Sequence, residues 1–275
     1  MIPRSWTRVA FGLYLLVFLL FLFVPFAVMG ITAFNATSYP QVVPFEGFTL
    51  KWFAALGEDA ELIDGLWNSL GIALAVALLS VALGLSGAMF LRHLGRKSRQ
   101  AFGALLLAPI LTPGVIIGIS TVIFWRGITR HTGVDVLYNG TFITVLAQSS
   151  FISAYCMLVF NARFENFDKS LEEAARDLGA NRLHVLLHVV LPYLRPALWT
   201  GAGLAFLSSL ENYNATTFSI LADKTFITVL ASRVRLGITP AISALAVLTI
   251  LATATLIAVY ECVHRRSLHK RKISA

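Results

Sequence analysis

Residues 170–198 read SLEEAARDLGANRLHVLLHVVLPYLRPAL, a charged segment between two stretches that are long and apolar enough to cross a membrane. Ser170 and Glu173 have the spacing of a capping box, in which each side chain satisfies the backbone amide of the other. Gly179 is placed to end the helix in a left-handed conformation. The apolar residues between them recur at i, i+3, i+4 and i+7, which predicts an amphipathic helix: Leu171, Ala174, Ala175 and Leu178.

A second short helix is predicted directly afterwards. Asn181 is a suitable N-cap for Arg182–Val190, and Pro192 and Pro196 are expected to close this helix before the next span. Two such short helices are marginal in water unless they pack against something. The segment therefore reads as a helical hairpin over residues 170–192 that has a docking surface, with a solvated connector between two spans as the open alternative.

The composition places the chain in the membrane class. Apolar residues make up 57% of the 275, 13% are charged, and the mean hydropathy is +0.76. About 20 helical residues cross the roughly 30 Å of hydrocarbon in a bilayer. Six segments meet this length, near residues 11–34, 67–91, 101–125, 142–160, 196–221 and 240–263. The first is too long for the apolar core of a signal peptide, so we expect an uncleaved helix.

The distribution of basic residues orients these six spans. With the N-terminus inside, sixteen of the 22 Lys and Arg residues fall in the inner segments and six in the outer ones. The positive-inside rule therefore predicts that both termini are cytoplasmic and that the hairpin between the fourth and fifth spans is cytoplasmic too. This placement accounts for the net charge of +8 without a nucleic acid partner.

Two spans carry features that suit a solute path. The third contains APILTPGVIIGIST, in which Pro109, Pro113 and two glycines predict a kinked or locally unwound helix. Interrupted helices often mark solute paths in transporters, although a purely structural kink remains open. The fifth contains Glu211, about fifteen residues and roughly 22 Å beyond Pro196.

An ionisable residue at membrane depth is a functional candidate by default. The residues predicted to line a translocation path with Glu211 are Ser208, Asn212, Tyr213 and Thr216. Glu211 would attract a cation and Tyr213 would offer a ring face for a cation–π contact. The open alternative is a helix that ends early and leaves Glu211 in water at the surface. Gln148, Ser149 and Tyr155 in the fourth span are equally compatible with solute contacts and with hydrogen bonds between helices.

Several other site types are not supported by the sequence. His184 and His188 have a zinc-like spacing, but the glutamate of the metalloprotease motif is replaced by Val185 and no third ligand is evident. We therefore predict no metal site. Cys156 and Cys262 fall in predicted spans, so no disulfide is expected. The dipeptide Gly-Lys never occurs, which excludes a phosphate-binding loop of the usual pattern, and no catalytic motif is present. The chain is predicted not to be an enzyme.

The hairpin residues carry a family resemblance. Glu173-Ala174-Ala175, three residues, Gly179, nine residues and then Val189-Val190-Leu191-Pro192 resemble the EAA signature of the permease subunits of ABC importers. The family has isoleucine where this chain has Val189, a change that keeps an apolar branched side chain. The match has the correct spacing over twenty residues and lies before the penultimate predicted span.

This resemblance implies an all-α integral membrane fold of the MetI-like permease type, with six transmembrane helices and a cytoplasmic coupling hairpin. It implies that the hairpin seats in a cytoplasmic ABC ATPase dimer, with contacts and flanking residues drawn from Glu172, Glu173, Ala174, Ala175, Arg176, Asp177, Gly179 and Pro192. The other implied partners are a second, homologous permease, a periplasmic or lipid-anchored solute-binding protein, and membrane lipid. The chain itself would bind no cofactor, because ATP and magnesium would belong to the ATPase, and it would lie in a bacterial inner membrane.

Softer similarities point to one branch of the family. Trp67–Leu70 looks like the start of the family's core, and Ser208–Phe218 and Leu236–Leu251 are similar to permeases for spermidine and putrescine. Related permeases for ferric iron, thiamine, phosphonates or opines share much of this pattern. Polyamines are therefore the expected solutes, and those other solutes are the alternatives.

Overall fold

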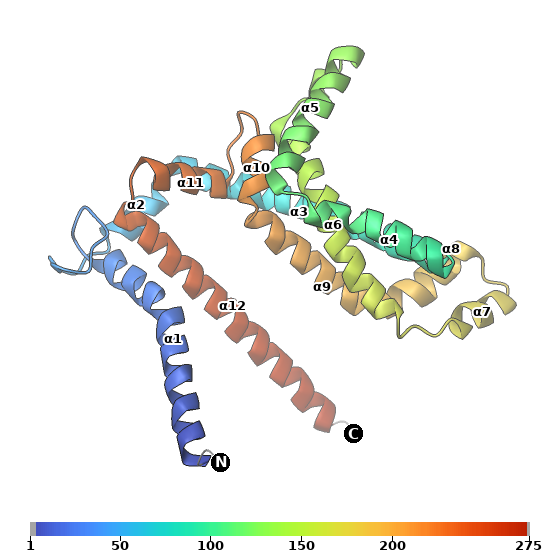
Figure 1. Cartoon of the computed structure of the whole chain (residues 1–275), viewed down its shortest axis with the longest axis horizontal. Coiled ribbons are helices and arrows are strands. Elements are labelled where there is room, and N and C mark those ends of the chain that lie inside the picture. Colours follow the sequence, from blue (N-terminus) through green and yellow to red (C-terminus); the bar gives the residue numbers. More distant parts are fainter. Residues whose placement is uncertain (1–3, 274–275) are drawn as a thin grey trace. The chain divides into compact units, whose positions relative to one another are not determined.

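The protein is described by a computed structural model that gives the backbone of residues 4–273 and the side chains of residues 8–255 and 258. Within these residues it is all helical, with one isolated β-bridge between Asn35 and Phe48 (Figure 1). The predicted all-α class is confirmed. The α-helices are α1 (Arg4–Phe34), α2 (Lys51–Gly57), α3 (Ala60–Arg92), α4 (Arg96–Leu111), α5 (Gly114–Thr132), α6 (Gly140–Phe164), α7 (Ser170–Asp177), α8 (Arg182–Val185), α9 (Leu191–Leu210), α10 (Tyr213–Ser219), α11 (Phe226–Leu236) and α12 (Pro240–Ile273).

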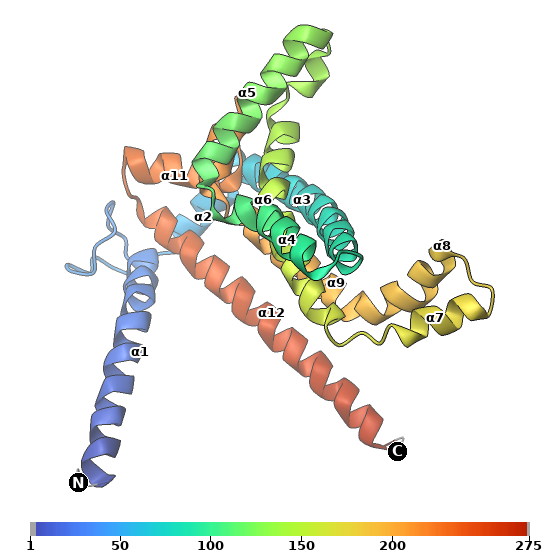
Figure 2. The ribbon, with the colours of Figure 1, turned by 45° about the vertical axis from the view of Figure 1, so that its right-hand side comes forward.

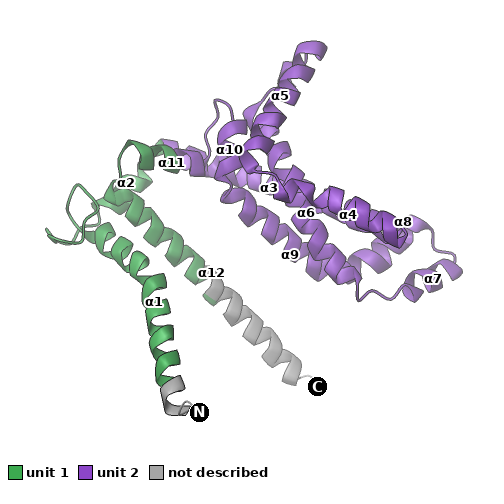
Figure 3. Ribbon diagram, in the orientation of Figure 1, with its two compact units in different colours: residues 1–60, 230–275 green, residues 61–229 purple. Residues whose placement is uncertain are grey.

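The chain forms two compact units (Figure 3). The smaller unit holds residues 1–60 and 230–275. In it α1 packs against α12, where the Thr32 hydroxyl donates to Ser243 Oγ over 2.9 Å. The loop after α1 is ordered by the buried Asn35, whose side chain donates to two backbone carbonyls and accepts from the amide of Glu46. Arg233 forms an ion pair with Asp59.

The larger unit, residues 61–229, contains both the hairpin of residues 170–192 and the predicted path residues around Glu211. Its core contains Ile72 and Val76 from α3, Ile152 and Phe160 from α6, and Leu194 from α9. Small residues allow these helices to approach closely. A methyl group added at Gly84 of α3 would lie 2.7 Å from Cβ of Cys156 in α6. One added at Gly201 of α9 would lie 3.0 Å from the ring of Phe160.

Three helices are long and apolar enough to cross a membrane: Arg8–Phe34, Ala60–Arg92 and Gly140–Phe164. They correspond to the first, second and fourth predicted spans. The second begins seven residues before its predicted start, because the helix continues past its apolar part and places Glu61 in its first turn, where a negative charge is favourable. The connection between the first and second predicted spans contains the short helix α2.

The predicted third span is two helices. α4 and α5 meet at an angle of 98° around Thr112 and Pro113, which are both non-helical. The expected interruption of this span is thus confirmed. Pro113 lacks an amide hydrogen and disfavours helical geometry at the residue before it, so the chain turns here.

The fifth predicted span also differs from its expected bounds. The helix expected over residues 196–221 starts earlier, at Leu191, and ends at Leu210, and α10 begins after a break at Glu211 and Asn212. The Asn212 side chain caps α10 by accepting from the Ala215 amide over 3.1 Å. α12 is helical across residues 240–263, and its described apolar segment is Pro240–Thr255. The side chain of Cys262 lies outside the described residues.

Candidate functional site: a surface hairpin and a polar cavity

The first helix of the hairpin is capped by Asp168. Its Oδ1 atom accepts from the Ser170 amide over 2.9 Å. Hydrogen bonds from the backbone and side chain of Ser170 hold the pKa of the Asp168 carboxyl below its ordinary value, so the cap stays ionised. The predicted capping box is wrong: Ser170 is already the first helical residue, preceded by Lys169 in helical conformation, so its hydroxyl does not occupy the N-cap position.

The turn between the two hairpin helices has the geometry that the sequence predicted. Gly179 has φ +87°, a left-handed conformation that favours glycine. Its amide donates to the Arg176 carbonyl over 2.8 Å and the Ala180 amide donates to the Ala175 carbonyl over 3.0 Å. This pair of bonds is a Schellman motif. The Asn181 side chain then accepts from the His184 amide over 2.8 Å, as expected for an N-cap.

The second hairpin helix does not end at the prolines. α8 continues through a π-helical turn, Leu186–Val190, directly into α9, so Pro192 and Pro196 both lie inside helix (Figure 2). The Leu191 amide donates to the Leu186 carbonyl, five residues back. This wider turn leaves room for the Pro192 ring, which has no amide to donate. The prediction that the prolines close the helix is therefore wrong.

The two faces of α7 differ in what they touch. Leu171, Ala174 and Leu178 are exposed, and Leu178 keeps 90% of its surface accessible. Glu173 and Asp177 are exposed beside them. This face offers apolar and acidic groups without a partner within the described chain.

The opposite face of α7 points into the larger unit. Ala175 packs against the core, and Glu172 accepts from Arg92 of α3 over 2.8 Å. Glu172 also forms an ion pair with Arg176, one helical turn further on, at 3.7 Å. Of the eight predicted coupling residues, Glu172 and Ala175 thus face inward, and the other six, Pro192 included, are exposed.

A groove of about 420 Å³ lies between the two arms of the hairpin, lined by Ala175, Gly179, His184, His188 and their neighbours. The two imidazole rings stack with centroids 4.0 Å apart, and His188 Nδ1 lies 3.1 Å from the His184 carbonyl oxygen. Among the described residues, no three His, Cys, Asp or Glu side chains are grouped to hold a metal ion. The histidine pair is thus a wall of this groove.

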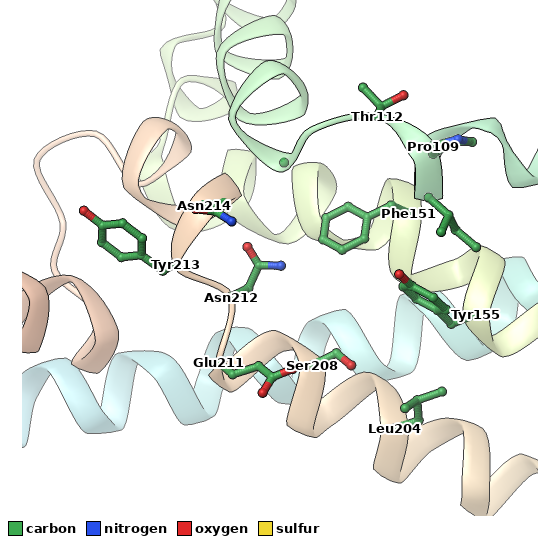
Figure 4. Close-up of a pocket in the computed structure, with 12 residues that line it drawn as sticks. Pro109, Thr112, Phe151, Tyr155, Leu204, Ser208, Glu211, Asn212, Tyr213 and Asn214 are labelled. Carbon is green, nitrogen blue, oxygen red and sulfur yellow. The ribbon is translucent and has the colours of Figure 1, made fainter. Parts of the chain in front are cut away.

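A second hollow, of about 410 Å³, opens where the two interrupted helices meet (Figure 4). The break between α4 and α5 contributes Pro109 and Thr112, and α6 contributes Phe151 and Tyr155. The end of α9 and the start of α10 complete the lining with Ser208, Glu211, Asn212, Tyr213 and Asn214. A carboxylate, aromatic rings and side-chain amides therefore share one cavity, which we call the polar cavity.

Four of the five predicted path residues line this cavity: Ser208, Glu211, Asn212 and Tyr213. Glu211 is exposed at the end of α9, so the helix ends early, as the alternative reading expected, and the carboxylate borders the cavity. Thr216 is not a lining residue. It is 1% exposed and its hydroxyl is engaged with Gln148 and the Asn212 carbonyl, because α10 turns this side of the helix toward α6.

Gln148 joins the two sides of the break between α9 and α10. Its Oε1 atom accepts from the Ser209 hydroxyl over 2.5 Å, and its Nε2 atom donates to Thr216 Oγ1 over 2.8 Å. Gln148 and Ser149 are each 1% exposed, so they form part of the helix interface, whereas Tyr155 borders the cavity. Sequence reasoning missed Phe151 and Thr112 as lining residues. The proline pair beside Thr112 was the available signal, and nothing local distinguishes Phe151 from a core residue.

Comparison with known proteins assigns the family. Residues 80–270 match the model of the binding-protein-dependent transport system inner membrane component. The chain belongs to this family. It is 32% identical over 230 residues, 83% of this chain and 81% of the relative, to the putrescine transport system permease protein PotI of Escherichia coli K12. It is 26% identical over 255 residues, 90% of this chain and 94% of the relative, to the spermidine/putrescine permease protein PotC of Haemophilus influenzae.

Solved structures share the fold. A chain of a bacterial alginate ABC transporter, in complex with an alginate-bound periplasmic protein, aligns over 94% of this chain and 93% of its own length, with a TM-score of 0.68 and 19% identity. A chain of an alginate-importing transporter aligns over 95% and 98%, with a TM-score of 0.61 and 17% identity. The expected permease fold is therefore confirmed, and both curated relatives are covered over most of their length.

Proposed function

We propose that this permease subunit forms half of the translocation pathway of an ATP-driven importer for putrescine, spermidine or a related small cation. The observation that carries the proposal is the composition of the polar cavity. Glu211 supplies a negative charge, Tyr155, Phe151 and Tyr213 supply rings, and Asn212 supplies an amide. A short polyamine has ammonium groups joined by apolar methylenes, and these are the groups that carboxylates and aromatic faces recognise.

The charge of the cavity also favours a cation over other cargo. The chain is also 29% identical, over 54% of its length, to a probable molybdenum ABC transporter permease of Haloferax volcanii. Sequence similarity alone therefore extends to permeases that are named for a different solute. A carboxylate bordering the path would repel an oxyanion and attract an ammonium group. With relatives named for putrescine at 32% identity over 83% of the chain, the cationic cargo is the better supported choice.

The importer assembly follows from the hairpin and the charge distribution. We infer from the distribution of basic residues and the positive-inside rule that both termini and the hairpin lie on the cytoplasmic side of a bacterial inner membrane. There the exposed face of α7, with Leu171, Ala174 and Leu178 beside Glu173 and Asp177, suits the groove of an ABC ATPase. ATP and magnesium would be bound by that ATPase dimer, and a second permease and a solute-binding protein would complete the importer. This chain would alternate access without catalytic residues of its own.

The first experiment tests the coupling surface. Replacing Glu173 with arginine should release the ATPase during co-purification and abolish uptake, while membrane insertion stays normal. Glu165→Arg is the matched control, since Glu165 is an exposed acidic residue just before the hairpin. Full retention of the ATPase and normal uptake in the Glu173 variant would refute the assignment of the hairpin.

The second experiment tests the cargo. Hydrogen bonds to charged groups contribute about 1.5–3 kcal/mol, so Glu211→Gln should reduce putrescine uptake roughly 10- to 100-fold without loss of the ATPase. Glu58→Gln, an exposed acid outside the cavity, should leave uptake unchanged. Ligand binding by the partner solute-binding protein should be measured in parallel with putrescine, spermidine, ferric iron, thiamine, a phosphonate and an opine. Binding of one of the last four alone would contradict the polyamine assignment.

A further inference from the structure

Arg92 ends α3 and reaches the hairpin. Its Nη2 atom donates to Glu172 Oε1 over 2.8 Å, with the side chains 12% and 18% exposed. An arginine in the last turn of a helix also interacts favourably with the helix dipole. α7 and α3, which lie 80 residues apart in sequence at these positions, are thereby joined by one charged contact.

Two aromatic rings enclose this contact. The Arg92 guanidinium carbon lies 4.2 Å from the ring centroid of Phe164 and 4.9 Å from that of Phe167. Both phenylalanines are 7% exposed, and Phe167 packs at 4.9 Å against Tyr193 of α9. Rings that exclude water lower the local dielectric and strengthen the charge pair compared with one on an open surface. Glu172 of α7 and the rings of Phe164 and Phe167 therefore converge on one guanidinium, and Tyr193 of α9 packs against Phe167.

The rest of α7 lies at the surface and makes little contact with the core. None of its residues is fully buried, and its contacts with the core run through Ala175 beside the charged contact. A helix of eight residues with one methyl group against the core would pivot on the connection that follows α6. The charge pair is the feature that opposes such a pivot, because breaking it leaves two charges in an enclosed site.

We propose that Arg92 and Glu172 form a latch that transmits displacement of the hairpin to α3, an inference that rests on the proposed coupling function of the hairpin. Glu172 and Glu173 then have different tasks although they are adjacent. Glu173 faces the partner ATPase, and Glu172 holds the hairpin to its own membrane domain. Arg92 is a positioning residue: without it, the hairpin moves with the ATPase while α3 stays behind.

The importer reconstituted in proteoliposomes with its partners tests the transmission step. In Glu172→Gln and in Arg92→Gln, the ATPase should stay bound and hydrolyse ATP, while uptake falls about tenfold, so that more ATP is consumed per solute. Arg92→Lys keeps the charge but loses the planar guanidinium that stacks on the two rings, so it should retain more uptake than Arg92→Gln and less than wild type. The double variant, Arg92→Gln with Glu172→Gln, should show an uptake per ATP no lower than that of either single variant. Uptake per ATP equal to wild type in both single variants would overturn the transmission role.

Hydrogen exchange on the full-length chain alone, in detergent, tests the latch without any partner. Amides of residues 171–177 should exchange several-fold faster in Glu172→Gln and Arg92→Gln than in wild type, while those of α6 stay protected, which verifies folding. Glu173→Gln should leave them unchanged. Equal exchange in all variants would overturn the latch. Faster exchange in the Glu172 and Arg92 variants, together with normal ATPase binding and uptake in Glu173→Arg, would instead overturn the proposed function and with it the transmission role.

Discussion

Gln148 holds the break that shapes the polar cavity, and replacing it by leucine tests this reasoning. The side chain is 1% exposed and bonds to Ser209 on α9 and to Thr216 on α10, one on each side of Glu211. Leucine is similar in size, so little volume is lost, and the change removes the two hydrogen bonds. Without them the ends of α9 and α10 are free to shift relative to α6.

The expected magnitude follows from the environment of each bond. Hydrogen bonds between membrane helices contribute about 0.6 kcal/mol on average and about 1.7 kcal/mol at most. Thr216 keeps its bond to the Asn212 carbonyl, whereas the buried Ser209 hydroxyl, 5% exposed, loses the acceptor described for it. The two bonds together therefore predict a loss of about 1–3 kcal/mol in the free energy of unfolding.

A double-mutant cycle measures this contribution. Unfolding free energies in detergent are compared for Gln148→Leu, Ser209→Ala and the double variant, with the exposed Gln100→Leu as control. We expect the double variant to lose less than the sum of the single losses, because both remove the same bond. Uptake should fall as well, since Glu211 leaves its position. Additive losses, or a Gln148 variant as stable as wild type, would refute the role assigned to Gln148.

Further predictions concern helix packing and the hairpin. Gly84→Ala should lower the free energy of unfolding by about 1–3 kcal/mol, because the new methyl group would lie 2.7 Å from a side-chain carbon of α6. Gly71→Ala, in the same helix with no heavy atom within 4 Å, should instead stabilise it in thermal unfolding. Gly179→Ala should cost the hairpin about 1–2 kcal/mol, measured by hydrogen exchange, because φ +87° is unfavourable for alanine. The pKa of Asp168 is lowered in the folded state, so its cap contributes fully above the unfolded pKa and is lost as pH falls through the lowered folded value. Asp168→Asn keeps an acceptor without titrating, so the difference in thermal stability between it and wild type should change with pH only in that acidic range.

The features that the sequence predicted correctly depend on local chemistry. Gly179 ends its helix and Asn181 caps the next one because both effects act within a few residues. The interruption near Pro113 followed from the missing amide of proline. Apolar length alone was sufficient to find the first, second and fourth spans.

The features that were missed depend on where a helix begins, on its local geometry and on contacts between distant segments. Whether Ser170 or Asp168 caps α7 depends on where the helix begins, and a difference of one residue changes the cap. Pro192 was expected to end a helix, but a π-helical turn before it accommodates the ring. Thr216 was expected in the path because it is polar, and its partner Gln148, 68 residues away, could not be known from the sequence. Local rules predicted turns and spans, but they could not predict which side of a helix packs against another helix and which side lines the cavity.

The polar cavity is a consequence of placing two broken helices side by side. α5 packs on α10 through glycines: a methyl group at Gly118 would lie 2.6 Å from the Ala215 carbonyl oxygen, and one at Gly114 would lie 3.2 Å from Asn214 Cβ. This close packing brings the break at Thr112 to the break at Glu211. Non-helical backbone at membrane depth is tolerated only against protein or water. Two such segments sharing one hollow therefore favour hydration there, and a hydrated hollow bordered by Glu211 is where a cation can leave bulk water at the lowest cost in free energy. The interruptions that made these spans hard to predict as single helices are thus the features that build the candidate path.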